Sequence, residues 1–268
     1  MGNLSQYVFD GVRYFINEMA KEEKSLRERK EDSGLVWASH VAKCPKKSAL
    51  RRATDEQEDF DFDTTLRMLI GTVVGGIVAK AMIKTGEETG IGVNVEEVIK
   101  TDLLSGRIDI SLISPEARID APVEVKYTSF WYPGFNIDHF SQLCAYMYAK
   151  GLTAGVLCMV YKTDGVKVFE VLKQGDSYYA YKTTGEAVSV NYDTTLPTDA
   201  YGNVCLKESD LVTMITERKA WLEFGHNNFN AALATIGPFM NVTKIPFECA
   251  WAKYPEKYKT NQIGRAHV

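Results

Sequence analysis

Two short segments near the middle of the chain alternate apolar residues with polar or charged ones. Residues 106–110 read GRIDI, and residues 123–126 read VEVK. Such alternation is typical of β-strands with one buried face, on which residues two apart share a side. Glu124 and Lys126 therefore share one face of their strand. Asp109 is the acidic residue of the other segment, GRIDI. Two carboxylates and a lysine on paired strands could bind a divalent cation and act on a phosphate.

The turn between the two segments decides which side chains face one another. If the chain reverses at residues 115–118 (PEAR), residues equidistant from the point between Glu116 and Ala117 pair, and Asp109 lies opposite Glu124. Directly opposed side chains have Cβ atoms about 5 Å apart. Two carboxylates at that distance repel each other unless one is protonated or a cation neutralises them. Because carboxylate ligands favour Mg²⁺ or Mn²⁺, the sequence predicts a site for one of these ions.

A second Arg-Ile-Asp triplet, residues 118–120, competes with the first. Asp120 has the parity to share a face with Glu124, but the two residues lie four positions apart along one strand. That separation is about 13 Å, so Asp109 is the predicted partner of Glu124. Lys126 lies one step beyond Glu124 on the same face. There it could orient or deprotonate a water molecule, or stabilise charge on a phosphate.

Other elements must hold this hairpin, and the periodicity of the sequence predicts them on both sides. Helical periodicity and a first strand precede the hairpin, whereas a helix, two strands and a further helix follow it. The predicted strands cover residues 93–100, 106–113, 122–129, 154–161 and 166–172. The predicted helices cover residues 40–54, 64–84, 138–150 and 209–234. This order predicts an α/β (α+β) architecture in which helices flank a mixed central sheet.

The helix predicted after the second strand adds Gln142 and Tyr146, which are four residues apart and hence on one helical face. GRIDI, VEVK and this Q-x-x-x-Y pattern together resemble the PD-(D/E)XK nuclease superfamily, in particular its RecB-type branch. The resemblance implies a restriction-endonuclease-like fold and a metal-dependent DNA nuclease, either an exonuclease or an end-processing enzyme. It implies that Asp109, Glu124 and the carbonyl of Val125 hold Mg²⁺ or Mn²⁺. It also implies that the helical face carrying Gln142 and Tyr146 points toward the metal or the DNA strand.

Within that branch the chain is most similar to the CRISPR-associated and phage RecB-like exonucleases. In those proteins a cysteine of an N-terminal helix is followed by basic residues, as in WASHVAKCPKKSALRRA here. The resemblance implies a [4Fe–4S] cluster, which needs four thiolates. The C-terminal segment FECAWAKYPEKY supplies Cys249 alone, so we expect the cluster to be absent and Cys44 and Cys249 to be its remnant. The basic residues that the resemblance implies for phosphate binding are Lys46, Lys47, Arg51 and Arg52.

Another departure from the family pattern lies upstream of the hairpin. The family's long helix commonly carries G-x-x-x-H, whose histidine approaches the metal. Here that helix reads GTVVG, and Gly75 stands at the histidine position. Glu96 and Glu97 are the remaining acidic candidates, and Glu97 is preferred because VEE leads into VIKTD. His139, three residues before Gln142, could face the site, but its place at the start of a helix favours exposure to water.

Composition limits the class of protein. With 268 residues and 45% hydrophobic residues, the chain is typical of a globular protein. A net charge of −4 argues against a polycationic DNA-coating protein but permits a local basic groove. The five cysteines are scattered and odd in number, which predicts a cytoplasmic protein rather than a secreted disulfide framework. The resemblance to CRISPR-associated and phage exonucleases implies a bacterial or phage origin. The apolar stretch 68–82 contains glycines and a lysine, so it predicts a buried helix and not a membrane span.

The chain divides into three predicted parts, with an N-terminal helix and charged linker at 1–34, the nuclease domain at 35–250 and a tail at 251–268. The last six residues, IGRAHV, resemble a translated sequencing adapter, so we expect the natural chain to continue differently after about Gln262. Two functions stay open. The first is an active nuclease on DNA ends or single strands, and the second is an inactive nuclease-like module. The second would bind nucleic acid or a partner in a recombination or CRISPR-adaptation complex.

Overall fold

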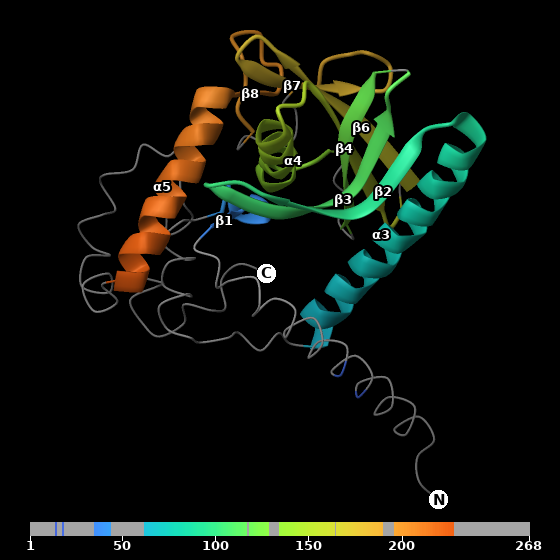
Figure 1. Ribbon diagram of the computed structural model, residues 1–268, viewed down its shortest axis with the longest axis horizontal. Helices are drawn as coiled ribbons and strands as arrows, with labels where there is room; N and C mark the ends of the chain where they lie inside the picture. The colour runs from blue at the N-terminus through green and yellow to red at the C-terminus, as the bar shows by residue number, and fades with distance from the viewer. Residues whose placement is uncertain are drawn as a thin grey trace, which may run out of the picture.

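The computed structural model describes residues 14, 18, 35–43, 62–116, 118–128, 134–163, 165–189 and 196–227. In this part of the chain a mixed, eight-stranded sheet is flanked by helices, which confirms the predicted architecture (Figure 1). The strands are β1 (Val36–Trp37), β2 (Gly92–Lys100), β3 (Leu104–Ser114), β4 (Ile119–Thr128), β5 (Ala154–Tyr161), β6 (Gly165–Gln174), β7 (Ser177–Lys182) and β8 (Cys205–Lys207). The helices are the 3₁₀ turn η1 (Ala38–His40), α3 (Phe62–Thr89), α4 (Ile137–Lys150) and α5 (Glu208–Asn227).

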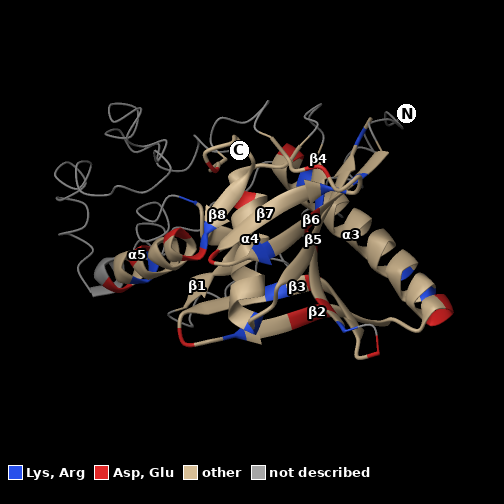
Figure 2. Ribbon diagram, turned by 90° about the horizontal axis from the view of Figure 1, so that it is seen from above, with Lys and Arg blue, Asp and Glu red and all other residues tan. Residues whose placement is uncertain are grey.

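The two faces of the sheet carry separate hydrophobic clusters. The strands run in the order β1-β3-β4-β5-β6-β7-β8, and β2 pairs with β3 off this path. On one face α4 packs across β4 and β5, and its cluster includes Ile108, Leu143 and Leu157. On the other face α3 packs against β4 and β2, where Ile110 and Val123 are buried. Figure 2 shows α3 and α5 at opposite sides of the sheet.

β3 and β4 form the antiparallel hairpin that the sequence predicted, in the predicted register. Ile110 pairs with Val123, and the ladder continues to Ser114 with Ile119. The chain then crosses over through α4 to β5, which runs parallel to β4. A parallel pair requires such a crossover. α4 therefore lies over the strands that carry the predicted site.

Both ends of α4 are fixed by local interactions. The helix begins at Ile137 because the side chain of Asn136 caps it, with Oδ1 accepting a hydrogen bond from the backbone N–H of His139 at 3.0 Å. It ends before Gly151, whose φ of 66° is left-handed and costs glycine little. All side chains over residues 140–147 are buried. The face that carries the polar residues of α4 is thus held firmly against the sheet.

α3 differs from its prediction in burial but not in kind. The sequence predicted a helix over 64–84 that is buried along its apolar stretch, 68–82. The structure has a longer helix in which Thr65, Ala79 and Gly86 are the buried residues. The prediction of burial was wrong for most of its length, because α3 packs on the sheet along one side, and Val73 and Ile77 are 59% and 62% exposed. By length and composition alone α3 could also cross a membrane.

Several predictions fall outside the described residues. They concern the proposed cluster remnant, the basic segment, most of the N-terminal helix and the tail. The residues involved are Cys44, Lys46, Lys47, Arg51, Arg52 and Cys249. The described cysteines, Cys144, Cys158 and Cys205, are buried and form no disulfide with one another.

Candidate active site

A gap between two strands lies at the centre of the candidate site. β2 runs along one edge of β3, and both β1 and β4 pair with the other edge. β1 pairs as far as Ser105, and β4 begins to pair at Ile110. In the described part of the chain, residues 106–109 therefore lack a paired strand on this edge. These are the residues of the GRID motif, and the divergence of β4 from β3 leaves room for side chains beside them.

Side chains take the place of the missing strand contacts. Oδ2 of Asp109 accepts a hydrogen bond from the backbone N–H of Val125 at 2.8 Å. The hydroxyl of Tyr146 donates to the carbonyl of Arg107, also at 2.8 Å. Because unpaired buried backbone groups are costly, both bonds stabilise the divergence of the strands. The predicted register sets Asp109 opposite Glu124, but the ladder ends one pair earlier and Asp109 binds the next residue instead.

Glu124 and Asp109 form a carboxylate pair in a largely buried setting. Glu124 is 1% exposed; its Oε1 lies 2.5 Å from Nζ of Lys126, and its Oε2 is buried without a hydrogen-bond partner. Burial raises the pKa of Glu124 to about 7, with Lys126 acting to lower it and Asp109 to raise it. Burial also raises the pKa of Asp109, against the opposing charge of Lys126. A further positive charge would stabilise both carboxylates in their ionised form.

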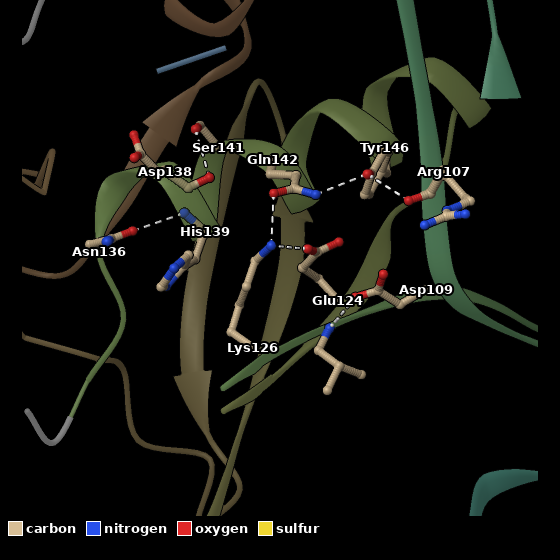
Figure 3. Close-up of polar contacts among 11 residues, drawn as sticks. Arg107, Asp109, Glu124, Lys126, Asn136, Asp138, His139, Ser141, Gln142 and Tyr146 are labelled. Atoms are coloured by element: carbon tan, nitrogen blue, oxygen red, sulfur yellow. Dashed lines mark hydrogen bonds and ion pairs between the residues drawn. The ribbon is translucent and has the colours of Figure 1, made fainter. Parts of the chain in front are cut away.

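A row of hydrogen bonds leads from Glu124 along α4 to β3 (Figure 3). Nζ of Lys126, which contacts Glu124, also donates to Oε1 of Gln142 at 3.1 Å. Nε2 of Gln142 donates to the hydroxyl of Tyr146 at 2.9 Å, and that hydroxyl donates to the carbonyl of Arg107. The structure therefore brings the lysine and the two helical residues that the sequence singled out into one connected group.

Gly106 makes room for Tyr146. A Cβ atom at position 106 would lie 2.6 Å from Cε1 of Tyr146 and 3.1 Å from Cβ of Ala38. We expect Gly106→Ala to push the ring away from Arg107 and to lower the free energy of unfolding by about 1–3 kcal/mol, measured by urea denaturation. Gly71→Ala is the control, because a Cβ there has no neighbour within 4 Å and alanine favours the helix. Unchanged stability of Gly106→Ala would contradict the packing role.

The hydroxyl of Tyr146 serves two partners at once. Tyr146→Phe leaves Nε2 of Gln142 and the carbonyl of Arg107 without these bonds. We expect a loss in the free energy of unfolding of about 1–3 kcal/mol, because the unpaired groups stay buried. Tyr181→Phe is the matched control, since its hydroxyl accepts an exposed bond from Gln174. Urea denaturation should show a clearly smaller loss in that control, and equal losses would argue against a special role for the Tyr146 hydroxyl.

The two upstream glutamates occupy different surroundings. Glu97 accepts a hydrogen bond from Ser111 at 2.5 Å and pairs with Lys150 at 3.1 Å. Burial acts to raise the pKa of Glu97, but these partners together lower it. Glu96 instead has a positive φ of 58°, and its charge acts to raise the pKa of Asp109. The sequence preferred Glu97 as the residue near the metal, and that preference stays a prediction. In the structure Glu97 is engaged by Lys150 and Ser111, and Glu96 pairs with Arg107 at 3.4 Å.

His139 reaches the site from the first turn of α4. The sequence favoured a water-exposed histidine, but the structure half-buries this side chain and leaves its Nδ1 buried without a hydrogen-bond partner. Burial, and then the charges of Lys126 and Lys43, lower the pKa of His139 to about 3. The signal that could have placed it was present in the sequence. Gln142 and Tyr146 follow His139 at spacings of three and seven, which puts all three on one helical face.

The donor set suits a small divalent cation. Oε2 of Glu124 is an unpaired, buried carboxylate oxygen, and Asp109 supplies a second carboxylate nearby. Among the residues that the structure describes, no group of three or more His, Cys, Asp or Glu side chains is arranged to hold a metal. Mg²⁺ is commonly held by one or two carboxylates, with waters and substrate phosphates completing its shell. The residues present therefore fit Mg²⁺ or Mn²⁺ better than a preformed zinc site.

No family model and no curated protein matches this chain. Among solved structures it is similar to an alkaline exonuclease (LHK-Exo) from Laribacter hongkongensis, at 15% identity and a TM-score of 0.46, over 76% of this chain and 95% of that one. LHK-Exo in complex with dAMP matches at 16% identity and a TM-score of 0.41, over 77% and 95% of the two chains. A phage related exonuclease from Haemophilus somnus 129PT matches at 12% identity and 0.41, over 74% and 95%. Likenesses this distant carry no functional conclusion, which has to come from the site itself.

Proposed function

We propose that this protein is a metal-dependent nuclease that hydrolyses phosphodiester bonds in DNA. The observation that carries the proposal is the buried, unpaired Oε2 of Glu124, near Asp109 and with Lys126 at the other carboxylate oxygen. Such a pair of carboxylates attracts a divalent cation, and a lysine beside the cation suits a phosphate substrate. The GRIDI and VEVK motifs support a place in the RecB-type branch of the PD-(D/E)XK superfamily, and hence action at DNA ends.

Each residue of the site has a proposed role. Asp109, Glu124 and the carbonyl of Val125 would hold Mg²⁺ or Mn²⁺, which when bound supplies a Lewis acid for a phosphoryl oxygen. Lys126 has three N–H donors, and Glu124 and Gln142 engage two of them. The third can bind the attacking water or a phosphate oxygen. The hydrogen bonds along α4 keep the ammonium group in this position.

The basic segment that follows Lys43 in the sequence is proposed to bind DNA phosphates. Lys43 is near enough to the site for its charge to act on His139. Each phosphate contact releases counterions, and DNA binding should therefore weaken steeply as the salt concentration rises. The proposed contacts are those of Lys46, Lys47, Arg51 and Arg52.

Cleavage of end-labelled DNA tests the proposed function. The wild-type chain should degrade single- or double-stranded DNA in the presence of Mg²⁺ or Mn²⁺ and leave it intact in EDTA. Release of the label as mononucleotides would indicate an exonuclease, and labelled internal fragments would indicate an endonuclease. If neither substrate is cut with either ion, the protein is not the nuclease proposed.

Gly75 favours a second candidate function. It stands where the resemblance expects a metal-side histidine, and a Cβ there would have no neighbour within 4 Å. The alternative is an inactive nuclease-like module that binds nucleic acid or a protein partner in a recombination or CRISPR-adaptation complex. In a gel-shift assay this module would retain DNA, and the same DNA would stay intact with Mg²⁺ and with Mn²⁺.

A further inference from the structure

Two buried atoms without hydrogen-bond partners lie on residues that surround Lys126. One is Oε2 of Glu124, and the other is Nδ1 of His139. Leaving a buried polar atom unpaired costs about 1–3 kcal/mol. The cation proposed above would pair with the glutamate oxygen. The histidine nitrogen would still need a partner.

The first turn of α4 fixes the position of the His139 ring. Asn136 accepts a hydrogen bond from the backbone N–H of His139, and His139 shares a helical face with Gln142 and Tyr146. Figure 3 shows the ring projecting beside the side chain of Lys126, whose charge acts on it. Along this face Tyr146 and Gln142 are already hydrogen-bonded to each other, and Gln142 to Lys126. His139 is the last residue on this face, and its Nδ1 has no hydrogen-bond partner.

The chemistry of the ring makes Nδ1 an acceptor. Because burial and the charges of Lys126 and Lys43 lower the pKa of His139 to about 3, the ring is neutral at physiological pH. A neutral imidazole has one N–H donor and one acceptor nitrogen, and its surroundings select which is which. Nδ1 is the nitrogen that is buried without a partner, and the positive charge of Lys126 acts on the ring, so we assign the lone pair to Nδ1. Nδ1 is thus an acceptor available to Lys126.

We propose that His139 is a positioning residue that accepts a hydrogen bond from Lys126 when a divalent cation binds Asp109 and Glu124. The inference rests on the metal site proposed above. In the structure Glu124 holds the ammonium group at 2.5 Å. A divalent cation on Glu124 repels that group and weakens the contact. Lys126 then keeps its bond to Gln142 and exchanges Glu124 for Nδ1 of His139.

The exchange prepares Lys126 for its proposed role. Its ammonium group is then held by two neutral acceptors, Oε1 of Gln142 and Nδ1 of His139, and its third N–H points to the water or the phosphate. Glu124, released from Lys126, can give both of its oxygens to the cation. His139 therefore contributes to metal affinity and to the cleavage rate without touching the substrate.

Binding of Mn²⁺ to the full chain, followed by electron paramagnetic resonance, tests this role without relying on cleavage. His139→Ala should weaken Mn²⁺ binding by about 10–100-fold, as loss of a residue that orients the groups around a metal does. His139→Asn should bind nearly as tightly as wild type, because its Oδ1 can occupy the position of Nδ1. His139→Gln carries its amide one bond further out and should not restore binding. Equal affinities of His139→Ala and wild type would overturn the proposal.

A second measurement follows the ring nitrogen in the unsubstituted protein. In ¹⁵N-histidine NMR, the Nδ1 resonance of His139 is identified by its loss in His139→Asn. Adding Mg²⁺ should move this resonance toward the position of a hydrogen-bonded acceptor, and Lys126→Met should show no such movement. A resonance that stays in place at saturating Mg²⁺, or one that moves equally in Lys126→Met, would rule out the exchange.

Cleavage assays separate this inference from the proposed function. If the wild-type chain neither binds Mn²⁺ nor cleaves DNA, both proposals fail together. If it does both, His139→Ala should lower kcat by about 10–100-fold with little change in KM for DNA, and His139→Asn should restore kcat. An unchanged kcat in His139→Ala would remove the role of His139 and leave the nuclease proposal standing.

Discussion

Asp109→Asn should abolish metal-dependent cleavage, with kcat/KM falling by at least about a thousand-fold. The amide keeps an oxygen that can accept the hydrogen bond from the Val125 N–H, but it removes the negative charge that holds the cation. The measurement is the initial rate of cleavage of end-labelled DNA at saturating Mg²⁺. Asp120→Asn is the matched control, because Asp120 ends the second Arg-Ile-Asp triplet and pairs with Lys150 at 3.5 Å. Wild-type activity in Asp109→Asn would exclude Asp109 from the metal site.

The same substitution should leave the metal-free protein at least as stable as wild type. Burial raises the pKa of Asp109 in the folded state. Any stabilisation by such a carboxyl is present below its unfolded pKa and is lost as the pH rises through its folded pKa. At pH 8 the ionised carboxylate therefore opposes folding, and the neutral amide does not. Urea denaturation at pH 8 in EDTA should show this, whereas a strongly destabilised Asp109→Asn would indicate a structural role.

Lys126→Met should slow cleavage by about 10²–10³-fold in kcat, the usual loss when one donor to a reacting group is removed. Methionine keeps an unbranched apolar side chain but has no ammonium group. The measurement is single-turnover cleavage at saturating Mg²⁺. Lys167→Met is the matched control. Met159 on β5 pairs with Lys126 on one side and with Lys167 on the other, so Lys167 is the lysine at the same register two strands from Lys126. Equal rates in the two variants would remove Lys126 from the chemistry.

Lys126→Met should also make the stability of the metal-free protein depend more on pH. Removing Lys126 leaves Glu124 without the ammonium that opposes the effect of burial on its pKa. The raised pKa of Glu124 then rises further, so the folded protein keeps Glu124 protonated at a pH where the unfolded chain ionises this carboxyl. The loss of stability relative to wild type should therefore grow between pH 5 and pH 8 by about 1 kcal/mol, because the wild-type pKa is already about 7 and one pKa unit corresponds to about 1.4 kcal/mol. Urea denaturation at the two pH values measures it, and a loss that does not grow would contradict the pairing.

The hairpin at the site was predictable from the sequence because two simple rules determine it. Alternation with a period of two assigns each side chain to a face, and the length of the turn sets the register, which Ile110 and Val123 follow. β5 occupies the predicted residues 154–161, because Gly151 and Gly165, both with positive φ, mark the turns on either side of it.

The divergence of the strands was not predictable in the same way. Register rules assign partners only while two strands stay paired. They do not predict where a different strand, here β1, replaces β4 along the same edge of β3. β1 has two residues, Val36–Trp37, which are too few to show any alternation. The bond from Val125 to Asp109 follows from this divergence, as does the contact of Tyr146 with Arg107. The carboxylates could be named from the sequence, but the way in which they are held could not.

Burial and backbone conformation account for the remaining differences. An apolar composition predicts that a helix packs somewhere, but it does not tell which sides of α3 find a partner, and Val73 and Ile77 stay exposed. Glu96 and Glu97 are adjacent acidic residues whose surroundings depend on a positive φ at Glu96. A left-handed conformation at a residue other than glycine is a local strain that the residue pattern does not reveal.

Anomalous diffraction from crystals soaked in Mn²⁺ would locate the ion directly. The proposed site predicts an anomalous peak within coordination distance of carboxylate oxygens of both Asp109 and Glu124. Nζ of Lys126 should then lie farther from Glu124 than it does now. The matched crystal of Asp109→Asn should show no peak there. If saturating Mn²⁺ leaves no peak between the two carboxylates, and Lys126 stays on Glu124 as it is now, the metal site is not where we place it.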